Sequence, residues 1–74
     1  MEENYFLVSS ITYAIKGQEL LQRKGYKAYV IRDRERNEHG CGYAILARAP
    51  RERAADILAA GHVKVAGVRE AEKR

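Results

Sequence analysis

Short apolar segments alternate with longer amphipathic or charged ones along the chain. Four of the apolar segments are rich in aromatic and branched residues and have the length of β-strands. They cover residues 4–9, 27–32, 42–48 and 62–68. The last residues have too little apolar content to pack, so we expect one domain over residues 1–70 and a frayed tail over 71–74.

The first helix is expected over residues 11–24, where a stripe of inward-facing positions recurs at the helical spacing. This stripe consists of Ile11, Ala14, Ile15, Gln18 and Leu21. Either Ser9 or Ser10 can cap its N-terminus by accepting a hydrogen bond from a backbone N–H group. Gly17 lies inside the helix at a cost of about 1 kcal/mol relative to alanine. We attribute this glycine to a close approach of the helix to the sheet.

The second helix is expected between Pro50 and Gly61. Proline suits the first helical position, because the N–H group that it lacks has no acceptor there. Glycine is a common residue at a helix end. The inward-facing positions of this helix are Ala54, Ile57 and Leu58.

The resulting order of elements is β-α-β-β-α-β, which predicts an α+β protein with the ferredoxin-like split βαβ fold. Right-handed crossovers give an antiparallel sheet with the strand order 4-1-3-2 and both helices on one face. The other face of the sheet has no helix over it. The apolar side chains expected on that face are Tyr5, Leu7, Tyr29 and Ile31.

The only cysteine in the chain, Cys41, lies between Gly40 and Gly42 at the start of the third strand. The third strand is expected to run back along the first. Cys41 should therefore lie at the same end of the sheet as Ser9 and Ser10, where the first helix begins. A buried and chemically idle cysteine is the common alternative in a small protein, and it stays open here.

A thiol at that place would be reactive. The partial positive charge of a helix N-terminus favours the thiolate and lowers the pKa of a cysteine from its free value of about 8.5. Three cationic side chains of the same edge would add to this effect, namely Arg32, Arg34 and His39. Gly40 and Gly42 leave the backbone accessible and permit positive φ angles, so that N–H groups can turn toward an anion.

The same residues resemble a family of small selenium/sulfur carrier-like proteins. The resemblance extends over about residues 4–70 and depends on a Ser-Ser pair, a helix, a glycine stop and a Cys-Gly pair. The matching residues are Ser9, Ser10, Ala14, Ile15, Leu20, Leu21, Gly25, Cys41 and Gly42. Residues 32–40 depart from the family pattern, because they contain neither the proline nor the serine expected there.

This resemblance implies that Cys41 holds a persulfide or perselenide and hands it to another protein. No cofactor is implied beyond the sulfur or selenium bound covalently to Cys41. The implied partners are donor and acceptor proteins of sulfur or selenium metabolism, such as a cysteine desulfurase-like enzyme. The chain also lacks a convincing acid/base pair, which favours a carrier or binding protein over an independent catalyst.

Composition bears on the other classes of function. The net charge of +4 is modest, and basic and acidic side chains alternate over residues 32–38, which argues against a nucleic-acid patch. We expect no membrane span and no secretion signal. A single cysteine forms no internal disulfide, so the reducing cytoplasm is the expected compartment. His39 and Cys41 fall short of a four-ligand metal site, and His62 is expected in solvent at a strand entrance.

Two other interpretations stay open. An interaction or regulatory module would self-associate through the uncovered sheet face, and a small core without disulfides favours such a homodimer. A small RNA-binding domain would share the strand order and stack bases on Tyr5 and Tyr43. The third strand, however, lacks the basic-Gly-aromatic signature of those domains. Tyr43 and Ile45 share one face and would equally form a stripe that packs internally or against a second copy.

Overall fold

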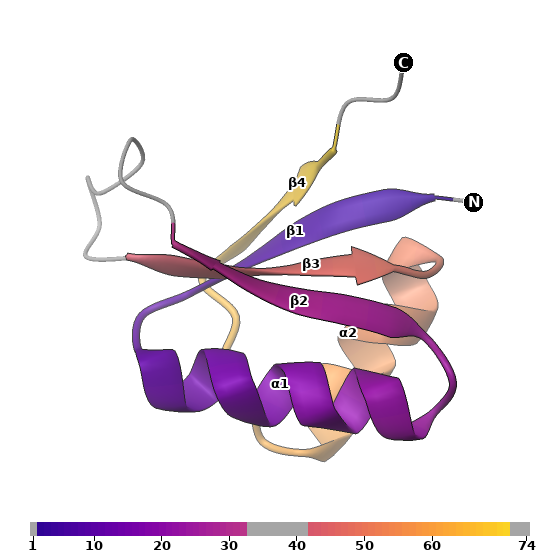
Figure 1. Ribbon diagram of the computed structural model, residues 1–74, viewed down its shortest axis with the longest axis horizontal. Helices are drawn as coiled ribbons and strands as arrows, with labels where there is room; N and C mark the ends of the chain where they lie inside the picture. Colours follow the sequence, from indigo (N-terminus) through magenta and orange to yellow (C-terminus); the bar gives the residue numbers. More distant parts are fainter. Residues whose placement is uncertain (1, 33–41, 72–74) are drawn as a thin grey trace.

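The structure, a computed structural model, describes residues 2–32 and 42–71 (Figure 1). The expected order of strands and helices is confirmed. The elements are β1 (Glu3–Val8), α1 (Ile11–Arg23), β2 (Lys27–Arg32), β3 (Tyr43–Arg48), α2 (Arg51–Ala60) and β4 (Gly67–Glu70).

The four strands form one antiparallel sheet in the order β2-β3-β1-β4, which is the predicted order read from the opposite edge. Both helices lie on the same side of the sheet (Figure 1). The α+β ferredoxin-like fold is therefore confirmed. Among the residues that the structure describes, no helix has the length and apolarity needed to cross a membrane.

Side chains of the sheet alternate between the two faces, as the pleat of a strand requires. In β1, Phe6 and Val8 point toward the helices and are fully buried, whereas Tyr5 and Leu7 point to the uncovered face and are half-buried. The core between sheet and helices consists of Phe6, Val8, Ala14, Leu21, Ala28, Ile45, Ala47, Ala49, Ala54, Leu58 and Val63. The alanines in this set leave room for the helices to approach the sheet closely.

The close approach predicted at Gly17 is confirmed. A Cβ atom at this position would collide with Cδ1 of Ile45 in β3 and would lie 2.9 Å from Cδ2 of Leu58 in α2. Gly17 is thus the point at which α1 meets both the sheet and the second helix.

The predicted inward stripe of α1 is only partly right. Ala14 and Leu21 are buried as expected, but Ile11 and Ile15 are 41% and 45% exposed. The reason is the contact at Gly17, which turns the helix so that its buried face is centred between Gly17 and Leu21. Ile15 then lies well outside that face.

Both helices end in the same hydrogen-bonded turn, in which the chain leaves through a residue with positive φ. After α1 this residue is Gly25, at φ 92°, and the N–H of Tyr26 donates to the carbonyl of Leu21 at 3.1 Å. After α2 it is His62, at φ 64°, and the N–H of Val63 donates to the carbonyl of Leu58 at 2.9 Å.

One expectation about α2 is confirmed and one changes in detail. Gly61 ends the helix as predicted, as its C-cap residue with φ −91°. A Cβ atom at Gly61 would collide with Cδ1 of Leu20 in α1. Pro50 is the residue before the first helical position, with an extended ψ of 139°, and Arg51 begins the helix.

The last strand begins later than predicted. Residues 62–66 connect α2 to β4, and pairing with β1 runs from Gly67 to Glu70. The alternation of Val63 and Val65 suggested a strand, but the N–H of Val63 completes the turn after α2. Ala71, expected in the tail, is buried, and its N–H donates to the carbonyl of Glu3 at 3.0 Å.

Candidate functional site

One end of the sheet gathers the described residues that the sequence singled out. Tyr43, the first residue of β3, lies opposite Val8 at the end of β1 and opposite Arg32 at the end of β2. We call this end, made up of Ser9, Ser10, Arg32, Gly42 and Tyr43, the Ser10 edge. The predicted meeting of the start of the third strand with the start of the first helix is confirmed.

Ser10 is the N-cap residue of α1. Its backbone is extended, with φ −144° and ψ 155°, and its hydroxyl oxygen accepts a hydrogen bond from the N–H of Tyr13 at 3.2 Å. Its carbonyl accepts from the N–H of Ala14 at 3.1 Å. Ser9, the other candidate cap, is exposed and lies just before the helix. The first turn of α1 contains no acidic residue, so no carboxylate there offsets the positive end of the helix.

Arg32 lies at this edge with its guanidinium carbon 5.9 Å from the centre of the Tyr43 ring. This distance is within the range of a cation–π contact. The contact favours a position of the arginine head over the start of β3, and the side chain is otherwise exposed. A cation is thereby available at the start of β3.

Gly42 is half-buried. Apart from its neighbours in the chain, no heavy atom of the described residues lies within 4 Å of the position that a Cβ atom on Gly42 would occupy. Arg34, His39, Gly40 and Cys41 lie outside the described residues, and Cys41 is the residue immediately before Gly42 in the chain.

Two glutamines of α1 join the helix to β2; the sequence placed Gln18 on the inward stripe of the helix but did not mark Gln22. The side-chain oxygen of Gln18 accepts a hydrogen bond from the N–H of Val30 at 2.8 Å. The side-chain nitrogen of Gln22 donates to the carbonyl of Ala28 at 3.0 Å. β2 is an edge strand, and these backbone groups have no neighbouring strand to pair with. The sequence signals for this role are the spacing of four residues between the two glutamines and the place of Gln18 on the inward stripe of the helix.

The uncovered face of the sheet carries the apolar side chains that were expected there. Tyr29 is 54% exposed, while Tyr5, Leu7 and Ile31 are half-buried. Polar groups flank them: Arg48 forms an ion pair with Glu3 at 3.2 Å, and the Arg69 guanidinium lies 5.0 Å from the centre of the Tyr5 ring.

The two aromatic residues considered for base stacking do not form one surface. Tyr43 lies opposite Val8, which is buried on the helix side, so Tyr43 belongs to that face. Tyr5 belongs to the uncovered face and already contacts Arg69. This geometry argues against an RNA-binding platform.

No cluster of three or more His, Cys, Asp or Glu side chains suited to a metal ion occurs within residues 2–32 and 42–71. His62 is exposed, as expected, and adopts its positive φ at the end of α2. The Ser10 edge thus combines a capped helix terminus, an arginine and an open glycine, with no metal-binding set among these residues.

A comparison with protein-family models matches residues 3–70 to the family described as "Putative Se/S carrier protein-like". The match covers β1 to β4 and includes the Ser10 edge. No curated protein and no solved structure gives a significant match to the chain.

Proposed function

This chain belongs to the Se/S carrier-like family, and on that premise we propose that Cys41 accepts sulfur or selenium and passes it to a partner protein. The carried form is a persulfide or perselenide on the Cys41 sulfur. The partners are a donor, such as a cysteine desulfurase-like enzyme, and an acceptor protein of sulfur or selenium metabolism. The reducing cytoplasm is the compartment in which a single thiol would stay ready for loading.

The observation that carries this proposal is the register at the Ser10 edge. Gly42, which follows Cys41 in the chain, is next to Tyr43, and Tyr43 lies opposite Val8, two residues before the helix cap Ser10. The positive end of α1 and the Arg32 guanidinium favour an anionic sulfur near this edge. The described residues leave open space beside Gly42, which suits a close approach by the donor's sulfur.

The loading step needs no oxidant. The Cys41 thiolate attacks the terminal sulfur of a donor persulfide, the donor's sulfur–sulfur bond breaks, and the donor leaves as a thiolate. Transfer to the acceptor repeats the same exchange in the other direction. Because Cys41 is the only cysteine in the chain, no second thiol of this protein can expel the cargo by forming an internal disulfide.

The first test is the pH dependence of iodoacetamide alkylation of the folded protein. We expect the labelling rate to rise with a midpoint below about 8.5, the value of a free cysteine. Arg32→Gln should move the midpoint upward, whereas Arg51→Gln, at the other end of the sheet, should leave it unchanged. A midpoint at the free value, or no labelling before denaturation, would exclude the carrier role.

The second test is loading itself. After incubation with a cysteine desulfurase and cysteine, or with a selenium donor, mass spectrometry should detect one added sulfur or selenium atom on the wild-type protein. Cys41→Ser should remain unmodified. The proposal fails if the wild-type and Cys41→Ser proteins give the same spectrum.

A second candidate function is favoured by the uncovered sheet face. The exposed ring of Tyr29, together with Ile31 and the other apolar side chains there, fits a module that self-associates as a homodimer. This function requires no chemistry at Cys41. It is also compatible with a dimeric carrier, so the oligomeric state and the thiol chemistry have to be measured separately.

A further inference from the structure

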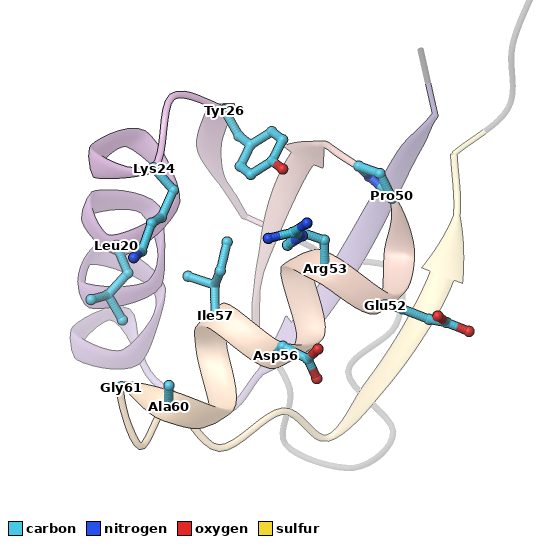
Figure 2. A pocket seen from close by; sticks show the side chains of 10 residues that line it. All are labelled: Leu20, Lys24, Tyr26, Pro50, Glu52, Arg53, Asp56, Ile57, Ala60 and Gly61. Carbon is cyan, nitrogen blue, oxygen red and sulfur yellow. The ribbon is translucent and has the colours of Figure 1, made fainter.

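A groove of about 740 Å³ lies between the second half of α1 and the outer side of α2 (Figure 2). Its lining residues are Leu20, Lys24, Tyr26, Pro50, Glu52, Arg53, Asp56, Ile57, Ala60 and Gly61. The volume is in the range of sites that hold a small molecule or a short peptide segment. It has no part in the site described above.

The floor of this groove is apolar and is supported by the core. Leu20, Tyr26 and Ile57 are each partly buried and pack against the core cluster. Gly61 keeps α2 close to Leu20, since a Cβ atom there would collide with that side chain. The floor is therefore held by the same helix–helix contact that stabilises the fold.

The charges at the groove are sorted by sign. Arg53 extends from α2 toward α1 and Tyr26, and Lys24 lies along the α1 wall above Leu20 (Figure 2). Glu52 and Asp56 also line the groove, on its α2 side, and their carboxylates are turned away from α1 (Figure 2). Within residues 2–32 and 42–71, neither Lys24 nor Arg53 forms an ion pair or a side-chain hydrogen bond. Two cations without a partner among the described residues thus lie between the helices beside a partly apolar surface.

The groove lies toward the end of the sheet opposite the Ser10 edge. Lys27 at the start of β2 lies opposite Arg48 at the end of β3, and Tyr26 and Pro50 are close to these two residues in the chain. Gly42 and Ser10 mark the other end. An occupant of the groove would leave the residues around Gly42 accessible.

We propose that this groove docks a partner protein through a short segment that carries both a carboxylate and bulky apolar side chains. The carboxylate pairs with Arg53 and Lys24, and the apolar side chains cover Leu20 and Ile57. Charge complementarity selects this occupant: among the described residues, Lys24 and Arg53 have no counter-ion where they enter the space between the helices, and the carboxylates of Glu52 and Asp56 are turned away from α1 (Figure 2). A cationic segment would meet two like charges, and a neutral one would leave both cations desolvated without a partner. The docking is independent of any chemistry at Cys41.

The test uses the Cys41→Ser protein, so that its result is separate from the carrier function. A capped peptide of leucine, phenylalanine and aspartate is titrated while backbone amide chemical shifts are recorded. We expect shifts confined to residues 20–26 and 50–61. Arg53→Gln and Lys24→Gln should each weaken binding by about threefold to tenfold, as expected for one charged contact at a partly exposed site. Arg51→Gln, an exposed arginine of the same helix outside the lining, should not weaken it.

Five outcomes would overturn the proposal. A peptide in which lysine replaces aspartate would bind equally well if charge did not select the occupant. Octanoate would bind as tightly as the peptide if the groove were a site for a small anionic amphiphile. Shifts on the uncovered sheet face, or shifts that appear with protein concentration alone, would identify another surface or a second copy as the occupant. Unchanged binding by the Arg53→Gln and Lys24→Gln variants would remove the basis of the inference.

Discussion

At the scale of single residues, two of the described positions, Gly25 and His62, adopt left-handed backbone conformation, and only the first has a residue suited to it. Gly25 has φ 92° and no Cβ atom to clash with the backbone. His62 has φ 64° at the equivalent place after α2 and retains a side chain. A residue with a Cβ atom is destabilised in this conformation by about 1–2 kcal/mol. The second helix thus ends in a turn with a strained residue.

We predict that His62→Gly stabilises the protein. Relief of the strain should exceed the extra entropy of glycine in the unfolded chain, leaving a net gain of about 0.5–1 kcal/mol in the free energy of unfolding. Urea denaturation followed by circular dichroism measures it. As a control, Gly25→Ala should lower the free energy by about 1 kcal/mol. A loss of stability in His62→Gly would show that the imidazole makes a stabilising contact.

Single residues also show what the sequence could not reveal. The sequence could not distinguish Ser9 from Ser10 as the N-cap of α1. In the structure Ser10 is the N-cap, and its backbone is extended. Gly61 was expected only as a helix stop, but a Cβ atom there would also collide with Leu20. A glycine can be required for its backbone freedom or for the absence of a side chain, and only the atoms around its Cα distinguish the two.

At the scale of the elements, α1 and the edge strand β2 are joined by side chains as well as by the connection between them. Gln18 accepts from the N–H of Val30, and Gln22 donates to the carbonyl of Ala28. Each bond satisfies a backbone group that no neighbouring strand can reach. The helix therefore fixes the position of the outer strand along its length.

Removal of the hydrogen-bond acceptor of Gln18 should lower the free energy of unfolding. Gln18→Ala leaves the partly buried N–H of Val30 unpaired, and we expect a loss of about 1–2 kcal/mol in the free energy of unfolding. Gln18→Glu keeps an oxygen acceptor and should retain most of the stability at neutral pH. Glu19→Ala, at an exposed position of the same helix, should change it by less than about 0.5 kcal/mol. Hydrogen exchange of the Val30 amide provides a local readout, and unchanged protection in Gln18→Ala would contradict the assignment.

Gly17 supplies a second prediction at this scale. Alanine at this position gains about 1 kcal/mol of helix propensity. Its Cβ atom, however, would collide with Ile45 and approach Leu58, and overpacking of this kind typically costs about 1–3 kcal/mol. We expect Gly17→Ala to be less stable than wild type in thermal unfolding. Lys16→Ala, on the exposed side of the same turn, is the control for propensity alone. A stabilised Gly17→Ala would mean that the helix can move away from the sheet without loss.

The positions of the helices and strands in the sequence were predicted better than which of their side chains are buried. Apolar runs and glycine stops located all six elements within a few residues, apart from the start of β4. Ile11 and Ile15 fit the periodicity of a buried stripe, but they are exposed because contacts at Gly17, including the one with α2, set the rotation of α1. The spacing of apolar residues within one helix gives no information about such a contact. Val63 and Val65 were assigned to a strand for a similar reason. A segment that packs against the core after a helix end shows the same alternation of apolar and polar residues as a strand.

At the scale of the whole molecule, three surfaces are separate from one another. The Ser10 edge lies at one end of the sheet, the α1–α2 groove lies toward the other end on the helix side, and the uncovered face lies opposite the helices. The element order and crossover handedness were sufficient to predict the first and the third. The groove was not predictable, because it depends on how Arg53 and Ile57 are oriented across the gap between the helices.

Self-association through the uncovered face makes a clear prediction at this scale. Tyr29→Lys places a charge at an exposed aromatic position of that face and should shift the protein toward the monomer in sedimentation equilibrium. Ile15→Lys, which alters an exposed apolar residue on α1 instead, should leave the association unchanged. A wild-type protein that stays monomeric at all concentrations would exclude the homodimer.

The glutamine side chains along β2 limit how many copies can join by backbone pairing. β2 and β4 are the two outer strands, and the backbone of β2 is already engaged by α1 at Val30 and Ala28. A fibre can grow indefinitely by strand pairing only if every copy offers two unpaired edge strands. Because α1 already engages the backbone of β2, pairing through β4 would join two molecules and then stop, so this route does not lead to a fibre.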